Sequence, residues 1–306
     1  MYFKNMRAIS GNVMDYTKKV FEYFSNNDAH HHIIITPHAP PVEKSSHGIE
    51  VAMENIWDDT DIRDTVLGLK NYGEETALSP GNPKTLELGL SETFCLSISG
   101  VGRFRVSYLT QRGSLSFSMK RIPFVVESCT DLHVDASLVE STLEVLCDNN
   151  GGIVAVFGPL AEANSRLVYA LIKRINSRQR RIIHILEREL MFLMRHDNSI
   201  IIQRELGTDC TSLNEGIRES LTMNPDIIFA GDLLVTDKIP ALERAAETGT
   251  SIILSVVAND KEAFLHLLKS ICGDHYAVFG RRIREVIEVR SQTDGKLSAT
   301  LAAKTK

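Results

Sequence analysis

The sequence lacks a long apolar run, a surplus of basic residues and any internal repeat or low-complexity block. No stretch approaches the roughly 20 apolar residues of a membrane-spanning helix, and the polar start MYFKNMRAIS has no signal-peptide core. The 34 Lys and Arg against 39 Asp and Glu give a net charge of −5, which argues against binding along a nucleic-acid backbone. These absences predict a cytoplasmic protein without a nucleic-acid partner.

Residues that bind metals or form disulfides are few and scattered. The five cysteines have no CxxC spacing, which argues against a zinc site and a disulfide framework and favours small core residues. They are Cys95, Cys129, Cys147, Cys210 and Cys272. His30, His31 and His32 are consecutive, and consecutive strand residues point to opposite faces. The sequence therefore predicts no metal site.

Apolar residues are present in sufficient number, 43% of 306 residues, to form two cores. Residues 94–98, 104–108 and 115–119 alternate apolar with mostly polar side chains, a pattern typical of half-buried antiparallel strands. Glycines separate these segments, which favours a meander. The sequence predicts an α+β domain over residues 1–125, and Pro123 stands near its end.

The apolar period changes after this boundary. The segment GGIVAVF at 151–157 reads as a buried strand, and a helical pattern follows it. Further apolar strands alternate with helical segments, as in a parallel sheet. These strands are expected at residues 181–186, 226–230 and 251–257. A closing hairpin is expected over 285–306, and the α/β domain as a whole over 135–306.

A strand, loop and helix at GIVAVFGPLAEANSR stand where a phosphate-binding loop of the form GxxxxGK[ST] would stand. Gly158 matches the first glycine and Ser165 the hydroxyl position. Ala163 replaces the second glycine, and Asn164 replaces the lysine. The segment fits an ordinary strand-to-helix turn as well. The candidate loop residues are Gly158, Pro159, Asn164, Ser165 and Arg166.

Further segments follow in the order known from one family. QREL, NPDIIFAGDL and ERAAETGT resemble the QRE, DPDxxLxGE and AAETGH segments of the PilT-type pilus-retraction and type II secretion ATPases, and GRFRVSY resembles their arginine-bearing strand. These segments are residues 203–206, 224–233, 243–250 and 102–108. The resemblance runs from about residue 30 to about residue 270. It implies a hexameric ring protein in which a smaller PAS-like α+β domain precedes a RecA-like P-loop-type domain.

The resemblance also shows which parts of an ATPase are altered. The glutamate that polarises the attacking water falls on Asp232, and the acidic segment of the family keeps Glu187, so these two are the vestigial catalytic candidates. A neutral Asn164 cannot supply the charge of the lysine. Other family residues are replaced outright. The arginine–aspartate pair falls on Leu234 and Val235, two acids on Arg188 and Met191, and the two histidines on Thr250 and Val257.

Arg103, Arg105 and Arg112 lie where family members have arginines that reach a neighbouring subunit's nucleotide in trans, although they also suit a solvated strand face. We expect a PilT-like pseudo-ATPase subunit or regulator of a type IV pilus, which drives twitching motility, or of a related secretion machine. No cofactor is expected, with ATP and magnesium only if the altered site still binds them.

The expected assembly is a homo-hexamer or a mixed ring with an intact pilus motor ATPase. It would lie at the cytoplasmic face of the inner-membrane pilus platform, peripheral to the membrane through its partners. Two alternatives stay open: a weakly active ATP-binding pilus motor, and a stand-alone scaffold or sensor with no catalytic role.

Overall fold

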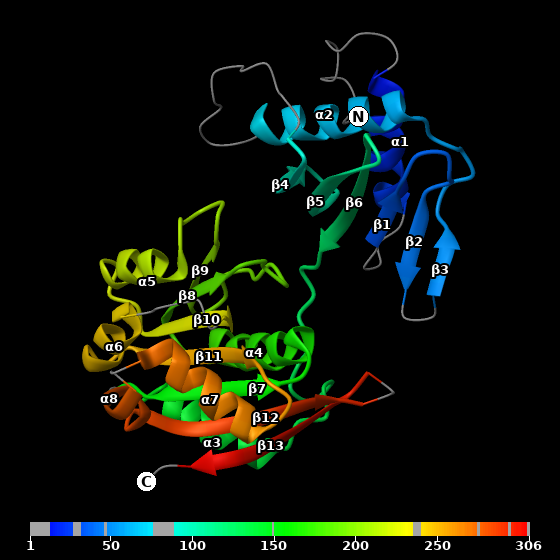
Figure 1. The fold of residues 1–306 in the computed structure, drawn as a ribbon. Coiled ribbons are helices and arrows are strands. Elements are labelled where there is room, and N and C mark those ends of the chain that lie inside the picture. Colours follow the sequence, from blue (N-terminus) through cyan, green and yellow to red (C-terminus); the bar gives the residue numbers. More distant parts are fainter. Residues whose placement is uncertain are drawn as a thin grey trace. The chain divides into compact units, whose positions relative to one another are not determined.

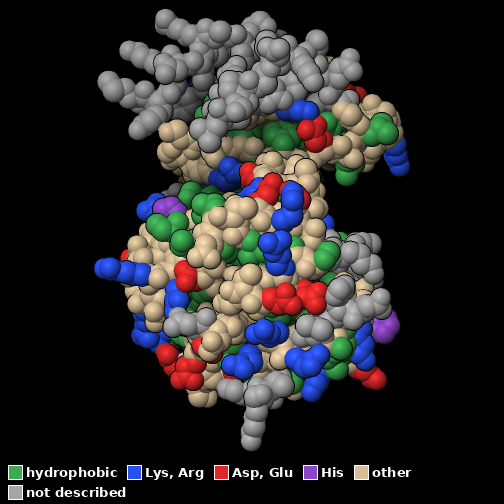
Figure 2. Space-filling model, turned by 90° about the vertical axis from the view of Figure 1, so that its left-hand side faces the viewer, with side chains coloured by type: hydrophobic (Ala, Val, Ile, Leu, Met, Phe, Trp, Pro, Cys, Tyr) green, Lys and Arg blue, Asp and Glu red, His purple; other side chains and the backbone are tan. Residues whose placement is uncertain are grey.

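The chain divides into two compact units, Met1–Pro123 and Phe124–Lys306, in the computed structural model (Figure 1). The described residues are 13–26, 32–45, 48–75, 89–148, 150–234, 240–273, 276–292 and 295–304. His30, His31 and Val235 lie outside them. Within them, every helix is too short or too polar to span a bilayer. Charged side chains of both signs are interspersed over the face shown in Figure 2.

The first unit, here called the amino-terminal unit, is an antiparallel sheet with two helices on one face. The sheet order is β3-β2-β1-β6-β5-β4. Its elements are α1 (Val13–Asn26), β1 (His32–Ile35), β2 (Val42–Ser45), β3 (Gly48–Val51), α2 (Asp59–Glu75), β4 (Ser91–Ile98), β5 (Gly102–Gln111) and β6 (Ser114–Ile122). Phe104, Val106 and Tyr108 alternate along β5 and pack in one core with Phe24 and Leu69 of the helices. The intervening residues of β5 therefore point to the other face of the sheet.

The second unit, the carboxyl-terminal unit, contains a seven-stranded sheet of order β13-β12-β7-β11-β10-β8-β9. All neighbouring strands in it are parallel except β12 and β13, which form the expected closing hairpin. The elements are α3 (Ala136–Leu146), β7 (Ile153–Gly158), α4 (Ala161–Asn176), β8 (Ile182–Glu187), β9 (Ile200–Glu205), α5 (Leu213–Leu221), β10 (Ile227–Leu233), α6 (Pro240–Glu247), β11 (Ser251–Val257), α7 (Lys261–Cys272), α8 (Tyr276–Gly280), β12 (Ile283–Ser291) and β13 (Leu297–Lys304). The predicted α/β class with a parallel sheet is confirmed.

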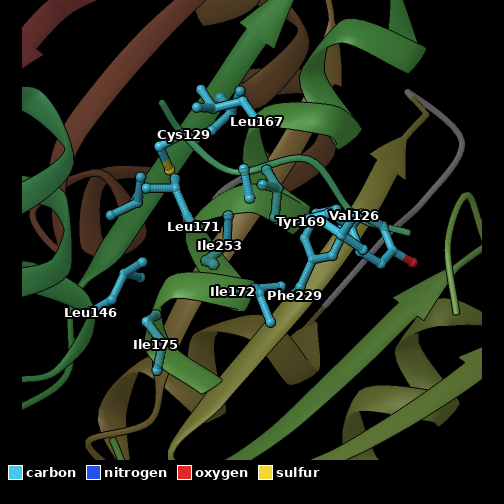
Figure 3. Packing of buried hydrophobic residues seen from close by; sticks show 14 of the residues in the cluster. Val126, Cys129, Leu146, Leu167, Tyr169, Leu171, Ile172, Ile175, Phe229 and Ile253 are labelled. Carbon is cyan, nitrogen blue, oxygen red and sulfur yellow. The ribbon is translucent and has the colours of Figure 1, made fainter. Parts of the chain in front are cut away.

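Helix α4 is fixed against this sheet by one continuous apolar face. Leu167, Leu171 and Ile175 repeat every four residues and are each about 1% exposed. Figure 3 shows them in one cluster with Phe229 of β10 and Ile253 of β11. Burying one such side chain fully stabilises the fold by about 1.5–3 kcal/mol. The position of the first turn of α4 is therefore set by the core beneath the rest of the helix.

All five cysteines are free thiols, with Cys129 and Cys210 buried and the other three half-buried. Burial in the apolar core raises the pKa of Cys129, and the same cause raises the pKa of Cys272 to about 11. Their environments are those of unreactive packing residues.

Candidate functional site at the carboxyl edge of the parallel sheet

The candidate residues of the carboxyl-terminal unit meet where its parallel strands end, the edge at which open α/β sheets bind ligands. Gly158 ends β7 and pairs with Val257, the last residue of β11. Glu187 ends β8, beside Gly231 of β10, where a Cβ would lie 2.6 Å from the Glu187 Cγ. Asp232 follows with a φ of 49°, at an irregularity in the β10–β11 pairing. The structure thus brings these predicted residues to one edge.

The connection between β7 and α4 is much shorter than a phosphate-binding loop. Strand β7 ends at Gly158 and α4 begins at Ala161, so that only half-buried Pro159 and exposed Leu160 join them. The backbone N–H of Asn164 donates to the Leu160 carbonyl at 3.2 Å, an ordinary helical bond. Phosphate binding requires backbone N–H groups that point at the anion. The backbone N–H at the lysine position, that of Asn164, donates within the helix instead.

The Asn164 side chain is fully buried and ties the helix to two strands. Its Nδ2 donates to the Val256 carbonyl at 3.1 Å and to the Gly158 carbonyl at 3.4 Å. A Cβ at Gly158 would lie 2.7 Å from the Asn164 Oδ1 and 2.2 Å from the Val289 carbonyl oxygen. Gly158 therefore allows β7, β12 and the Asn164 amide to pack closely. The side chain at the lysine position points into the protein.

Ser165 and Glu187 belong to a buried hydrogen-bond network. The Ser165 hydroxyl donates to Glu187 Oε1 at 3.2 Å, and the Tyr169 hydroxyl donates to Glu187 Oε2 at 2.6 Å. Glu187 is 2% exposed and Tyr169 is 0% exposed. Burial, and then the adjacent Glu187 carboxylate, raise the pKa of Tyr169 well above its ordinary value. The hydroxyl that would bind magnesium in a P-loop protein thus serves an internal carboxylate.

Sequence reasoning missed Tyr169 and Gln203 as members of this network. Gln203 of β9 donates from Nε2 to the Tyr169 hydroxyl at 3.4 Å and to the Phe192 carbonyl at 2.7 Å. The available signal was spacing, because Tyr169 stands four residues after Ser165 and so lies on the same face of α4.

Arg166 has a structural partner in the same unit. Its Nε and Nη2 donate to the two carboxylate oxygens of Glu127, both at 2.7 Å, and Nη2 also donates to the Gly295 carbonyl at 2.9 Å. The Glu127 hydrogen bonds raise the pKa of Arg166. This fork-shaped ion pair joins α4 to the segment before α3 and to the closing hairpin, which is an adequate structural reason for the arginine.

The structure separates some residues that sequence reasoning had grouped. Thr250 precedes β11, at the opposite end of that strand from Val257, and its hydroxyl donates to the Pro225 carbonyl at 3.2 Å.

Arg103 and Arg105 lie on β5, whereas exposed Arg112 lies in the β5–β6 turn with a φ of 49°. Six residues lie between Arg105 and Arg112, and at the rise of an extended chain the two positions stand about 23 Å apart. Arg112 therefore lies apart from Arg103 and Arg105.

Arg103 and Arg105 share the face of the sheet opposite α1 and α2. Arg103 Nη1 donates to the Ser97 hydroxyl at 3.3 Å, and Arg105 is 7% exposed. Among the described residues, no group of three or more His, Cys, Asp or Glu side chains is placed to hold a metal ion.

Comparison with known proteins yields no matching family model. The type IV pilus ATPase PilU of Pseudomonas aeruginosa is 24% identical over 228 residues, which cover 74% of this chain and 56% of PilU. The retraction ATPase PilT of the same organism is 27% identical over 166 residues, covering 54% and 47%. An uncharacterized Escherichia coli protein, YggR, is 26% identical over 211 residues, covering 69% and 60%.

The chain is a homologue of the PilT-type ATPases. The predicted resemblance is therefore confirmed, and the chain spans about half to three-fifths of the length of these curated relatives. Solved structures agree on the fold. The pilus retraction motor PilT with bound ADP aligns with a TM-score of 0.75 at 21% identity over 97% of this chain and 84% of that one. The ATPase DotB of Legionella pneumophila aligns with a TM-score of 0.67 at 16% identity, over 98% and 82%.

Proposed function

We propose that this PilT homologue is a subunit or regulator of a type IV pilus or related secretion machine, and that it turns over little or no ATP. The observation that carries the proposal is the buried amide of Asn164, which fills the lysine position and hydrogen-bonds two strand ends. The residues at the altered loop fit magnesium and a triphosphate poorly, because Asn164, Ser165 and Arg166 already hydrogen-bond to other parts of the fold.

The energies favour the internal contacts over a nucleotide. A lysine contact to a phosphate is a charge-assisted bond worth about 1.5–3 kcal/mol, so its loss lowers affinity by about tenfold to a hundredfold. If magnesium binding turns the Ser165 hydroxyl away from Glu187, the buried carboxylate also loses one donor. A buried group that loses its partner costs a further 1–3 kcal/mol, approximately. These costs act together on the affinity for magnesium ATP.

Calorimetry with magnesium ATP and a phosphate-release assay test this proposal. We expect turnover at background in the wild-type protein and weak or undetectable binding. Asn164→Lys combined with Ala163→Gly should increase ATP affinity if the cradle is the main loss. Micromolar binding with steady turnover that Asp232→Asn abolishes would instead support a weakly active pilus motor, the second candidate, which the retained acids Asp232 and Glu187 favour.

For assembly, we propose a ring of identical copies, or a mixed ring with an intact pilus motor ATPase at the cytoplasmic face of the inner-membrane pilus platform. A head-to-tail contact between subunits must close into a ring or grow into a filament. The amino-terminal arginines would then act on a neighbouring subunit. In mixed rings, alanine at Arg103, Arg105 and Arg112 should lower the partner's ATP turnover, and Arg63→Ala, at an exposed position of α2, serves as the control. Equal turnover in every variant would mean that these arginines do not act on a neighbouring subunit.

A further inference from the structure

One face of the amino-terminal sheet lies opposite both helices of that unit. Helices α1 and α2 pack on the face that carries Ile33, Ile35 and Phe104. The side chains that alternate with these residues therefore point to the other side, here called the open face. Strands β3, β2, β1 and β6 follow one another in this sheet (Figure 1), and their registers arrange the open face in two rows that run across the strands.

The first row is aliphatic. Val51 of the edge strand β3 pairs with Val42 of β2, and Val42 pairs with Ile34 of β1. Val51 is 60% exposed, and Ile49, which stands two residues from it on the same face of β3, is 67% exposed. Exposed aliphatic side chains that adjoin one another indicate a contact surface.

The second row is cationic. Ile49 pairs with exposed Lys44, and His32 pairs with exposed Lys120. After burial, the charges of Lys120 and Lys44 lower the pKa of His32, which shows that these groups lie close together. Lys44 stands two residues from Val42 on the same strand, so the cationic row adjoins the aliphatic row.

Acidic side chains lie on the other side of this sheet. On the described strands the open face has no Asp or Glu, although the chain has a net charge of −5, and Arg103 and Arg105 of β5 lie on it as well. The acids of β2 and β3, Glu43 and Glu50, pair with each other on the side of the helices. Glu43 accepts a hydrogen bond there from the Tyr23 hydroxyl of α1 at 2.6 Å. The open face therefore combines cations with aliphatics and excludes negative charge.

We propose that the open face binds an anionic lipid bilayer directly, without a partner protein. The exposed aliphatic side chains of β3 enter the boundary between headgroups and acyl chains, and Lys44 and Lys120 lie against the lipid phosphates. Cations beside exposed aliphatics are the combination by which peripheral segments bind a membrane interface. A free phosphate or an acidic peptide would use the lysines and leave the aliphatic side chains in water, which favours a bilayer as the occupant.

Co-sedimentation of the full chain with vesicles tests this contact. The probes are vesicles of phosphatidylcholine alone and of phosphatidylcholine mixed with phosphatidylglycerol, without nucleotide. We expect binding to the mixed vesicles that weakens as salt is raised, and only background with phosphatidylcholine alone. Lys44→Gln with Lys120→Gln should lower the affinity for mixed vesicles about thirtyfold. Lys18→Gln with Lys19→Gln removes the same charge from α1, on the other side of the sheet, and serves as the matched control.

The aliphatic contact is tested by Ile49→Thr with Val51→Thr, because threonine keeps a β-branched side chain that suits the strand. With both lysines in place, this pair should lower the affinity for mixed vesicles about tenfold. Leu301→Thr, at a 43% exposed position of β13 in the other unit, is its control and should bind as the wild-type protein does. All variants should keep the circular dichroism of the wild-type protein, since the changed side chains lie outside the apolar cores.

Several results would overturn the proposal. Equal binding to both kinds of vesicle, or binding to neither, would show that the open face does not recognise an anionic bilayer. Equal losses in the Lys44 and Lys120 pair and in its α1 control would reduce the effect to net charge. An aliphatic pair that binds as the wild-type protein does would point to a purely electrostatic partner, such as an acidic protein. Release from the vesicles by inorganic phosphate at matched ionic strength would indicate a discrete phosphate site in place of a bilayer contact.

Discussion

The buried Asn164 amide makes the sharpest prediction about stability. Replacing it by alanine removes a 3.1 Å bond to the Val256 carbonyl and a weaker 3.4 Å bond to the Gly158 carbonyl. The Gly158 carbonyl keeps the backbone N–H of Ala258 at 3.0 Å. The main loss is therefore the Val256 contact in a fully buried site, and with the small void left behind we expect a cost of about 2 kcal/mol.

In a domain of 150–250 residues, about 1 kcal/mol lowers Tm by about 2–4 °C, so Asn164→Ala should lower the Tm of the carboxyl-terminal unit by about 4–8 °C. Calorimetric or circular-dichroism melting measures this. Asn198→Ala is the control, because its amide donates to the Ser177 carbonyl at an exposed position and its loss should cost little.

Asn164→Lys should lower Tm further, because an ammonium group in this buried position must either stay unpaired or break the first turn of α4. If Asn164→Ala and Asn164→Lys both melt with the wild-type protein, the amide does not hold α4 to the strand ends. The residue at the lysine position would then have no structural role.

Three further predictions concern other parts of the chain. Tyr169→Phe should destabilise the carboxyl-terminal unit by about 1.5–3 kcal/mol in urea unfolding, because it removes the 2.6 Å hydrogen bond to the buried Glu187 carboxylate. An unchanged free energy of unfolding would mean that the carboxylate does not need this donor. Burial, and then the charge of Arg204, lower the pKa of His184 to about 4. As pH falls, His184 is therefore protonated in the unfolded chain before it is protonated in the folded one. The free energy of unfolding should be at its full value above about pH 6.5 and fall by up to about 3 kcal/mol as pH drops towards 4. His184→Gln should flatten that part of the pH profile, and an unchanged slope would contradict the assignment. Brief chymotrypsin digestion should cut after Phe124, which is 49% exposed, to release two fragments, whereas a resistant chain would argue against two separable units.

Local patterns in the sequence determined the elements and the class of fold. The alternation of apolar and polar residues at 104–108 predicted a half-buried strand, because side chains of a strand point alternately to its two faces. The apolar runs at 153–157 and 251–257 predicted strands that are buried on both faces. In the structure these two strands are parallel neighbours in the sheet. The order of the QREL, NPDII and AAETG segments identified the ATPase family, which the curated relatives confirm.

Tertiary structure decided what the candidate residues do. The sequence shows that Asn164 replaces a lysine, but only the fold shows its amide buried against Val256, a residue 92 positions away. It likewise placed Ser165 against Glu187 and set Thr250 at the wrong end of β11 for the candidate site. The physical reason is that local periodicity reports which face of an element is buried. The partner that a polar side chain meets there depends on strand order and register, which join segments far apart in the chain.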